Sequence, residues 1–178
     1  MTRDQLEHAI RAACDVSGDT EVWVFGSQAI LGEHPDAPKS VCASIEVDIQ
    51  PKNHPEKVDE VDGALGELSP FNQAFGFYVH GISVAAAMLP PDWQSRVIPV
   101  SDAIGTKGKT GWCIEAHDLA ASKLAAFREK DRDFVRILLR EGLIQGAILR
   151  NRTASLSMDE ERRTRLIHWI DITLQELG

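Results

Sequence analysis

The sequence predicts an α/β (α+β) fold, in which a small mixed-sheet core is followed by a helical C-terminal subdomain. Two observations lead to this prediction. Short apolar or alternating segments typical of strands fall in the first two thirds of the chain, together with helical segments. From about residue 116 onward only helical patterns remain. We therefore expect an α/β core over residues 1–115 and a helical subdomain packed on it over residues 116–178.

Two strands of the core are indicated by different apolar patterns. The run 22–25 is almost continuously apolar, which is typical of a strand buried on both faces. The segment 44–49 alternates strictly. Because successive side chains of a strand point to opposite faces, Ile45, Val47 and Ile49 are expected to face the core together.

Apolar spacing and turn residues indicate the other elements. Helices are predicted over residues 3–16, 56–68, 117–128, 131–141, 143–149 and 159–176. Strands are predicted over 75–84 and 96–100, and a hairpin turn over 106–111 leads into residues 112–114.

Composition and charge exclude several classes of protein. No apolar run approaches the roughly 18 residues that a membrane helix needs. The three cysteines, Cys14, Cys42 and Cys113, are far apart, so they suggest neither a zinc site nor a disulfide framework. The first residues lack the basic start and apolar stretch of a signal peptide, so we expect a cytoplasmic protein. The net charge of −8 disfavours long-range attraction to nucleic acid, but the acidic excess lies in the first hundred residues.

Glu46 and Asp48 form the first candidate site. They lie two residues apart in a predicted strand, so both carboxylates project from one face. Two adjacent carboxylates repel each other unless a cation or a proton lies between them. Mg²⁺ suits such a pair, because it binds a few carboxylate oxygens together with waters and substrate phosphates. A polar strand face in contact with water is the alternative interpretation.

Gly26 and Ser27 form the second candidate site. They follow the strand 22–25 and precede a predicted short helix over 28–31. Backbone N–H groups at such a position, with the Ser27 hydroxyl, are able to bind a phosphate. The alternative is structural: Gly26 permits a turn and Ser27 caps the helix.

Two blocks of the chain resemble a known family. Residues 24–30 (VFGSQAI) followed by 44–48 (SIEVD) resemble the first motif of the nucleotidyltransferase (polymerase-beta-like) superfamily, in which Gly-Ser precedes an Asp-x-Asp pair. Residues 118–131 (DLAASKLAAFREKD) are similar to a later motif of its AbiEii/MenT-like branch, in which a helical Lys is followed by an Arg and an Asp. The resemblance covers about a fifth of the chain.

The resemblance implies roles for six residues and a reaction. Gly26 and Ser27 would contact the triphosphate of an NTP, and Glu46 and Asp48 would hold one or two Mg²⁺ ions. Lys123 would contact phosphate, and Asp131 would act as base or support the site. The nucleotide would pass to an RNA end, such as that of a tRNA, or to a protein hydroxyl. Bacterial members of this branch include toxins, so a cognate antitoxin is an implied partner.

Lys123 and Asp131 also have structural interpretations. Lys123 lies among small and apolar residues, so it is either a buried cation that needs an anionic partner or a side chain that reaches the edge of the core. Asp131 is suited to be the N-cap of a helix that begins near Arg132, and Asp133 competes for its role.

The chain departs from the superfamily pattern in three ways. Glu46 stands where Asp is usual, and the spacer between Ser27 and Glu46 is long and contains prolines. The superfamily usually adds a carboxylate from a neighbouring strand, but the best candidate strand has none and offers His80 or Ser83. Two alternatives therefore stand beside an active transferase. One is a catalytically reduced member that binds a nucleotide or a partner protein, and the other is a structural α/β domain.

Overall fold

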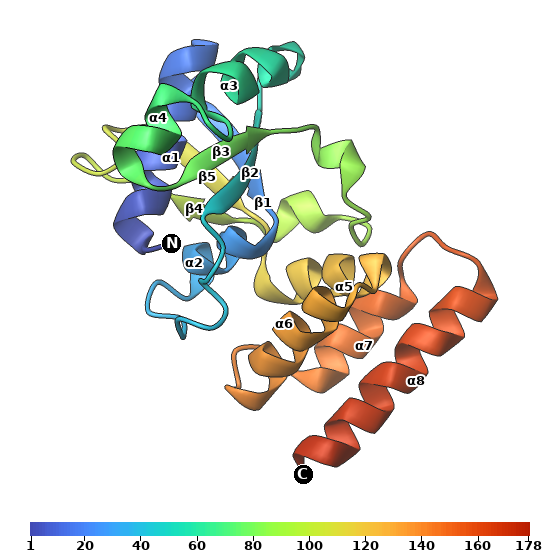
Figure 1. Ribbon diagram of the computed structural model, residues 1–178. Coiled ribbons are helices and arrows are strands. Elements are labelled where there is room, and N and C mark those ends of the chain that lie inside the picture. Colours follow the sequence, from blue (N-terminus) through green and yellow to red (C-terminus); the bar gives the residue numbers. More distant parts are fainter.

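The computed structural model describes residues 1–178 and contains one five-stranded sheet (Figure 1). The strand order is β3-β2-β1-β5-β4. β1 lies antiparallel to β2 and parallel to β5, β2 is parallel to β3, and β4 and β5 form an antiparallel hairpin. The strands are β1 (Glu21–Phe25), β2 (Glu46–Pro51), β3 (Tyr78–Gly81), β4 (Ile98–Val100) and β5 (Thr110–Cys113). The predicted α/β fold with a mixed sheet is confirmed.

The helices of the first part of the chain cover one face of the sheet. α1 is stabilised at its start by a capping box between Thr2 and Gln5 and ends at Gly18 in the left-handed region. α1 and α3 pack together against the face that carries Val47 and Ile49, which are fully buried. These helices are α1 (Arg3–Ser17), α2 (Ile30–Glu33), α3 (Val58–Leu65) and α4 (Pro70–Phe75), joined by the short 3₁₀ helices η1 (Ser27–Ala29) and η2 (Pro55–Lys57).

The opposite face of the sheet is only partly covered. The segment between β3 and β4 crosses it, with the ring of Trp93 packed edge-on against Trp23 at 5.0 Å between centroids. It contains η3 (Val84–Ala86) and η4 (Trp93–Ser95). Trp23 and Glu21 stay half-buried, so the expectation that β1 is buried on both faces was wrong. The apolar run misled because Trp23 lies on the partly covered face, where only the short η4 packs against it through Trp93.

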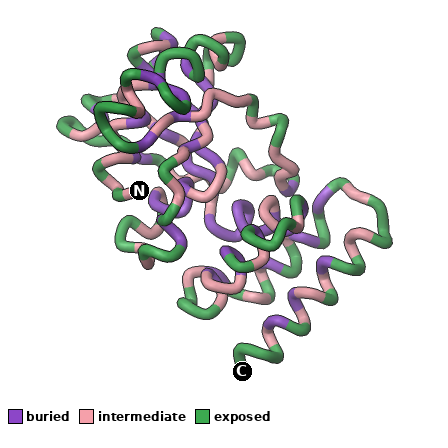
Figure 2. Tube along the Cα trace, viewed as in Figure 1, coloured by how far each residue is buried: buried purple, intermediate pink, exposed green.

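Four helices complete the chain and pack together below the sheet (Figure 1). They are α5 (Ala116–Ala126), α6 (Glu129–Arg140), α7 (Gly146–Ala154) and α8 (Glu160–Leu177). α5 is the most buried and contacts α2 and η1 on one side and α6 and α7 on the other, whereas α8 exposes much of its length (Figure 2). No helix combines the length and the apolar character needed to cross a bilayer.

Several predicted boundaries change in the structure. Ile45 is 53 % exposed, because β2 begins only at Glu46. The helix α4 was not predicted. It is only six residues long, with Ser69 as its N-cap and Pro70 in the first position. α6 begins at Glu129, so Asp131 lies in the first turn and is not an N-cap.

Candidate functional site

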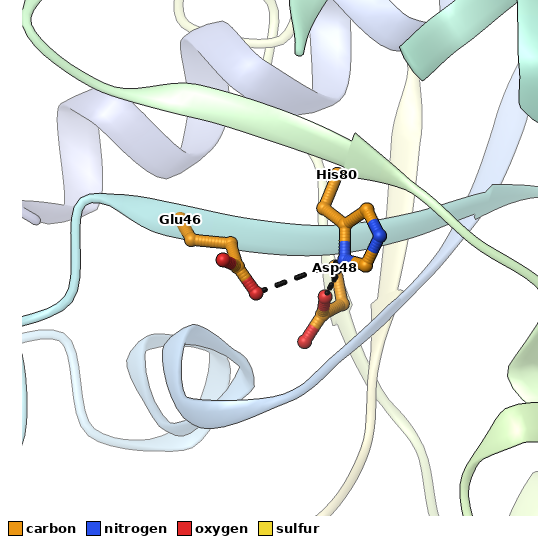
Figure 3. Close-up of side chains that lie close together, drawn as sticks. All are labelled: Glu46, Asp48 and His80. Atoms are coloured by element: carbon orange, nitrogen blue, oxygen red, sulfur yellow. Dashed lines mark hydrogen bonds and ion pairs between the residues drawn. The ribbon is translucent and has the colours of Figure 1, made fainter. Parts of the chain in front are cut away.

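The sheet register brings three potential ligand side chains together. β2 and β3 run parallel, with Glu46 opposite Tyr78 and Asp48 opposite His80. Paired residues of adjacent strands point to the same face, here the partly covered one. One ligand atom from each of Glu46, Asp48 and His80 lies within 4.8 Å of the others (Figure 3). The neighbouring strand β3 therefore adds a histidine to the two carboxylates.

Hydrogen bonds orient this cluster. His80 Nδ1 is 2.9 Å from Asp48 Oδ1 and 3.7 Å from Glu46 Oε1 (Figure 3). The hydroxyl of Tyr78 donates to Glu46 Oε2 at 2.6 Å. One oxygen of Glu46 is thus held by Tyr78, and the other is directed toward His80. The alternative third residue, Ser83, instead caps η3 by accepting from Ala85 N–H.

The surroundings of Asp48 shift the pKa of its carboxyl group. Burial raises the pKa of Asp48 above its ordinary value, and the neighbouring Glu46 raises it further, while the hydrogen bond from His80 acts in the opposite direction. The pKa of Tyr78 is also raised, mainly because its hydroxyl proton is bound to Glu46. Glu46 therefore lies close enough to both groups for its charge to disfavour their ionisation.

Gly26 brings the backbone directly against Asp48. It adopts φ 68° and ψ −172°, a region that is essentially restricted to glycine. A Cβ at this position would lie 2.0 Å from Asp48 Oδ2. Ser27 follows as the first residue of η1. Glycine is required here because the chain turns out of β1 beside a carboxylate of the next strand.

Lys123 and Asp131 form a second charged cluster on α5 and α6. Asp131 is 1 % exposed and accepts two hydrogen bonds from the Arg128 guanidinium, at 2.6 and 3.2 Å. Lys123 Nζ lies 3.8 Å from Asp131 Oδ1 and 5.8 Å from the centre of the Phe134 ring. Burial lowers the pKa of Lys123, whereas Asp131 and Asp48 act to raise it. Of the two interpretations of Lys123, the structure supports the largely buried cation with an anionic partner.

Both clusters line one cleft of about 810 Å³ between the sheet and the C-terminal helices. A cleft of this volume is within the range of small-molecule sites. All six residues singled out from the sequence contribute to its wall, and so does His80. The six are Gly26, Ser27, Glu46, Asp48, Lys123 and Asp131.

Sequence reasoning missed three polar contributors. Arg162 of α8 and Lys130 of α6 reach the same cleft, and Tyr78 binds Glu46. Tyr78 could have been found from the sequence, because residues two apart in a strand share a face and Tyr78 is two residues from His80. No sequence pattern indicates that α8 returns to the cleft, because this depends on how the last four helices pack.

One of the three comparisons with known proteins identifies a family. Residues 4–175 match a family described as a nucleotidyltransferase of unknown function (DUF6036). Searches of curated proteins and of solved structures found no match. The family description supports the superfamily that the two sequence motifs resemble. Because the match spans almost the whole chain, the protein belongs to this DUF6036 nucleotidyltransferase family.

Proposed function

We propose that the protein is a divalent-cation-dependent nucleotidyltransferase that transfers a nucleotide from an NTP to a hydroxyl group of an RNA end or of a protein. The observation that carries this proposal is the arrangement of the cleft. The acidic pair Glu46 and Asp48 lines it together with the cation Lys123, which lies near enough to Asp48 for their charges to interact. An NTP requires both, since its phosphates bind cations directly and through a metal ion.

Each residue receives a role that suits its position. Glu46 and Asp48 would hold the cation, which supplies charge neutralisation to the phosphate oxygens. Gly26, Ser27 and Lys123 would contact the triphosphate. Mg²⁺ is the ion that two carboxylates and phosphate oxygens alone would select.

Asp131 is better suited to a supporting role than to that of a base. Its two oxygens already accept hydrogen bonds from Arg128, and it is almost completely buried beside Lys123. A carboxylate in this arrangement holds the two cations in place. Asp133, the competing candidate, is exposed at the edge of the cleft.

The chemistry of the proposed reaction is a substitution at phosphorus. The acceptor hydroxyl oxygen forms a bond to the α-phosphorus, and the bond from this atom to the bridging oxygen of the β-phosphate breaks. Pyrophosphate leaves with the bonding electron pair, and the hydroxyl proton passes to a carboxylate of the cleft or to water. Positioning and charge stabilisation supply most of the acceleration in such a reaction.

For the acceptor, we propose an RNA end such as that of a tRNA, with a protein hydroxyl as the alternative. Four basic side chains line the cleft, and RNA phosphates would bind them although the chain as a whole is acidic. They are Lys123, Lys130, Arg128 and Arg162. The resemblance of residues 118–131 to the AbiEii/MenT-like branch supports the same acceptor. On the same resemblance we propose that the protein is a bacterial toxin, that it is cytoplasmic, and that a cognate antitoxin protein binds it.

A binding protein without turnover is the second candidate. The observation that favours it is the histidine at the third ligand position, where an active superfamily member usually has a carboxylate. Nucleotide binding would then persist, but no nucleotide would be transferred. A transfer assay therefore separates the two candidates.

Calorimetric titration of the four NTPs, with and without a divalent cation, tests the binding step. We expect at least one NTP to bind only when the cation is present. Asp48→Ala should abolish this binding, because it removes a metal ligand, whereas Asp36→Ala at an exposed position should leave it unchanged. NTP binding that is indifferent to Asp48→Ala would reject the assigned role of the acidic pair.

A further inference from the structure

We infer that Glu46, Asp48 and His80 together bind a divalent transition-metal ion, with Mn²⁺ preferred over Mg²⁺, and that Nδ1 of His80 is one of its ligands. The inference rests on the proposed function, which says what the metal ion does in this site, and it adds which ion binds there. It differs from the expectation of Mg²⁺, which considered the two carboxylates alone.

The positions of the three donor atoms suit a shared ion. Donors that bind one small divalent ion at about 2.0–2.2 Å lie within about 4.4 Å of each other. In this cluster His80 Nδ1 meets that limit with both carboxylates, at 2.9 and 3.7 Å, and all three atoms lie within 4.8 Å of one another. Nδ1 is the ring nitrogen that faces both carboxylates, so only small side-chain movements separate the observed geometry from ligation.

The ligand set is the reason to expect a transition metal. Mg²⁺ binds oxygen ligands and retains several of its waters, whereas an imidazole nitrogen is a common ligand of transition-metal ions. Mn²⁺ accepts carboxylates as well as imidazole, and it binds nucleotide phosphates. Replacement of a third carboxylate by His80 also removes one negative charge, which weakens the attraction for a hard, strongly hydrated ion. The nitrogen therefore does not fit a site dedicated to Mg²⁺.

The surroundings hold the ligands in place before an ion binds. Tyr78 binds one oxygen of Glu46 and leaves the other directed at the cluster. The next residue on β3, Gly81, donates its N–H to Asp62 of α3 at 3.1 Å, which anchors the end of the strand that carries His80. Hydrogen bonds to metal ligands of this kind fix their orientation.

A purely structural role for His80 predicts something different. If the ring only donates a hydrogen bond to Asp48, a glutamine at position 80 is able to replace it, and no nitrogen is bonded to the ion. If Nδ1 is a ligand, the ring must turn its lone pair toward the metal. The two roles are thus separated by whether a nitrogen nucleus couples to a bound paramagnetic ion.

The test uses the full chain, Mn²⁺ and no nucleotide. Free Mn²⁺ is followed by electron paramagnetic resonance during titration, Mg²⁺ is added as competitor, and pulsed measurements detect coupling between bound Mn²⁺ and ¹⁴N. The variants are His80→Gln, which keeps a hydrogen-bond donor, and His80→Asp, which restores a third carboxylate. His168→Ala, at an exposed position on α8, is the matched control.

We expect the wild type and His168→Ala to show ¹⁴N coupling and to bind Mn²⁺ more tightly than Mg²⁺. His80→Gln should lose the coupling and about tenfold in Mn²⁺ affinity. His80→Asp should lose the coupling and gain affinity for Mg²⁺. Absence of ¹⁴N coupling in the wild type, its persistence in His80→Gln, or equal affinity for the two ions would overturn the inference.

The result is independent of transfer activity. If the protein shows the ¹⁴N coupling but transfers no nucleotide, this inference stands and the proposed function is rejected. If the protein transfers a nucleotide but shows no ¹⁴N coupling, the proposed function stands and His80 is rejected as a metal ligand.

Discussion

At the scale of single residues, Gly26 determines how closely the backbone approaches Asp48. Its φ is positive, its ψ is extended, and the space that a Cβ would need is already occupied by the Asp48 carboxylate. Gly18 has the same φ but lies at the end of α1, where a Cβ would have no atom within 4 Å. Substitution of Gly18 therefore tests backbone strain alone, whereas substitution of Gly26 tests strain together with steric overlap with Asp48.

Gly26→Ala should lose metal and nucleotide binding, because the added methyl group must displace Asp48. Gly18→Ala should cost about 1–2 kcal/mol of stability, the ordinary cost of a left-handed alanine, and leave binding intact. Calorimetric titration and chemical denaturation of both variants measure these effects. A Gly26→Ala variant that binds NTP like the wild type would contradict the close approach as a requirement.

At the scale of elements, local alternation predicted which side chains each strand presents on one face. The family resemblance, and not a local pattern, pointed to a neighbouring strand that offers His80 or Ser83. Strict alternation placed Glu46 and Asp48 on one face, since this depends only on local geometry. The parallel pairing of β2 with β3, which brings His80 to Asp48, joins residues 32 positions apart. Such long-range pairing depends on the packing of the whole sheet and leaves no local pattern.

Short elements were the other source of error. α4 is six residues long and depends on one capping serine, so apolar periodicity had too few positions to reveal it. The alternative interpretation of Asp131 as an N-cap was wrong. The helix α6 begins at Glu129, its N-cap residue is Arg128, and the Arg128 guanidinium binds Asp131 in the first turn.

Asp19 connects two segments of the chain through its side chain. Both oxygens accept hydrogen bonds: from the backbone N–H groups of Thr20 and Glu21 at the start of β1, and from Asn53 and His54 after β2. Burial of Asp19 opposes ionisation, but these hydrogen bonds prevail and lower its pKa.

Asp19 should therefore stabilise the fold mainly above pH 4. Because its folded pKa lies below the unfolded value of about 4, its contribution is complete above that pH and is lost as the pH falls through the folded pKa. Asp19→Asn should lower the free energy of unfolding by about 1–3 kcal/mol at pH 7, and the difference from the wild type should shrink below pH 4. Urea denaturation at several pH values measures this, with the exposed Asp36→Asn as control. A difference that stays constant down to pH 2 would contradict the assignment.

At the scale of the whole molecule, the cleft exists because the C-terminal helices are fixed against the sheet. Asp118 of α5 is fully buried. It accepts a hydrogen bond from Arg96, before β4, at 2.8 Å and forms an ion pair with Arg152 of α7 at 3.0 Å. The sequence predicted the α/β core and the helices that follow it. It did not predict this network, because a single Asp in a helical pattern does not reveal its partners. We propose that residues 1–115 and 116–178 are two parts of one folding unit joined in this way.

Asp118→Ala should destabilise the whole chain by about 3–5 kcal/mol, since it leaves two arginines without their buried partner. Asp171→Ala, which removes an exposed pair with Arg150, should cost less than about 1 kcal/mol. Chemical denaturation followed by both fluorescence and circular dichroism would show whether a single transition remains. Similar small losses in both variants would contradict the role of Asp118.

The central claim is that the cleft transfers nucleotides with the help of Asp48. The most direct measurement incubates the protein with each of the four α-³²P-labelled NTPs, total RNA or cell protein, and Mg²⁺ or Mn²⁺. We predict that the wild type and Asp36→Asn attach label to an acceptor with at least one NTP, and that Asp48→Asn slows this by about 10³-fold. Absence of transfer by the wild type with every NTP, or equal transfer by Asp48→Asn, would contradict the claim.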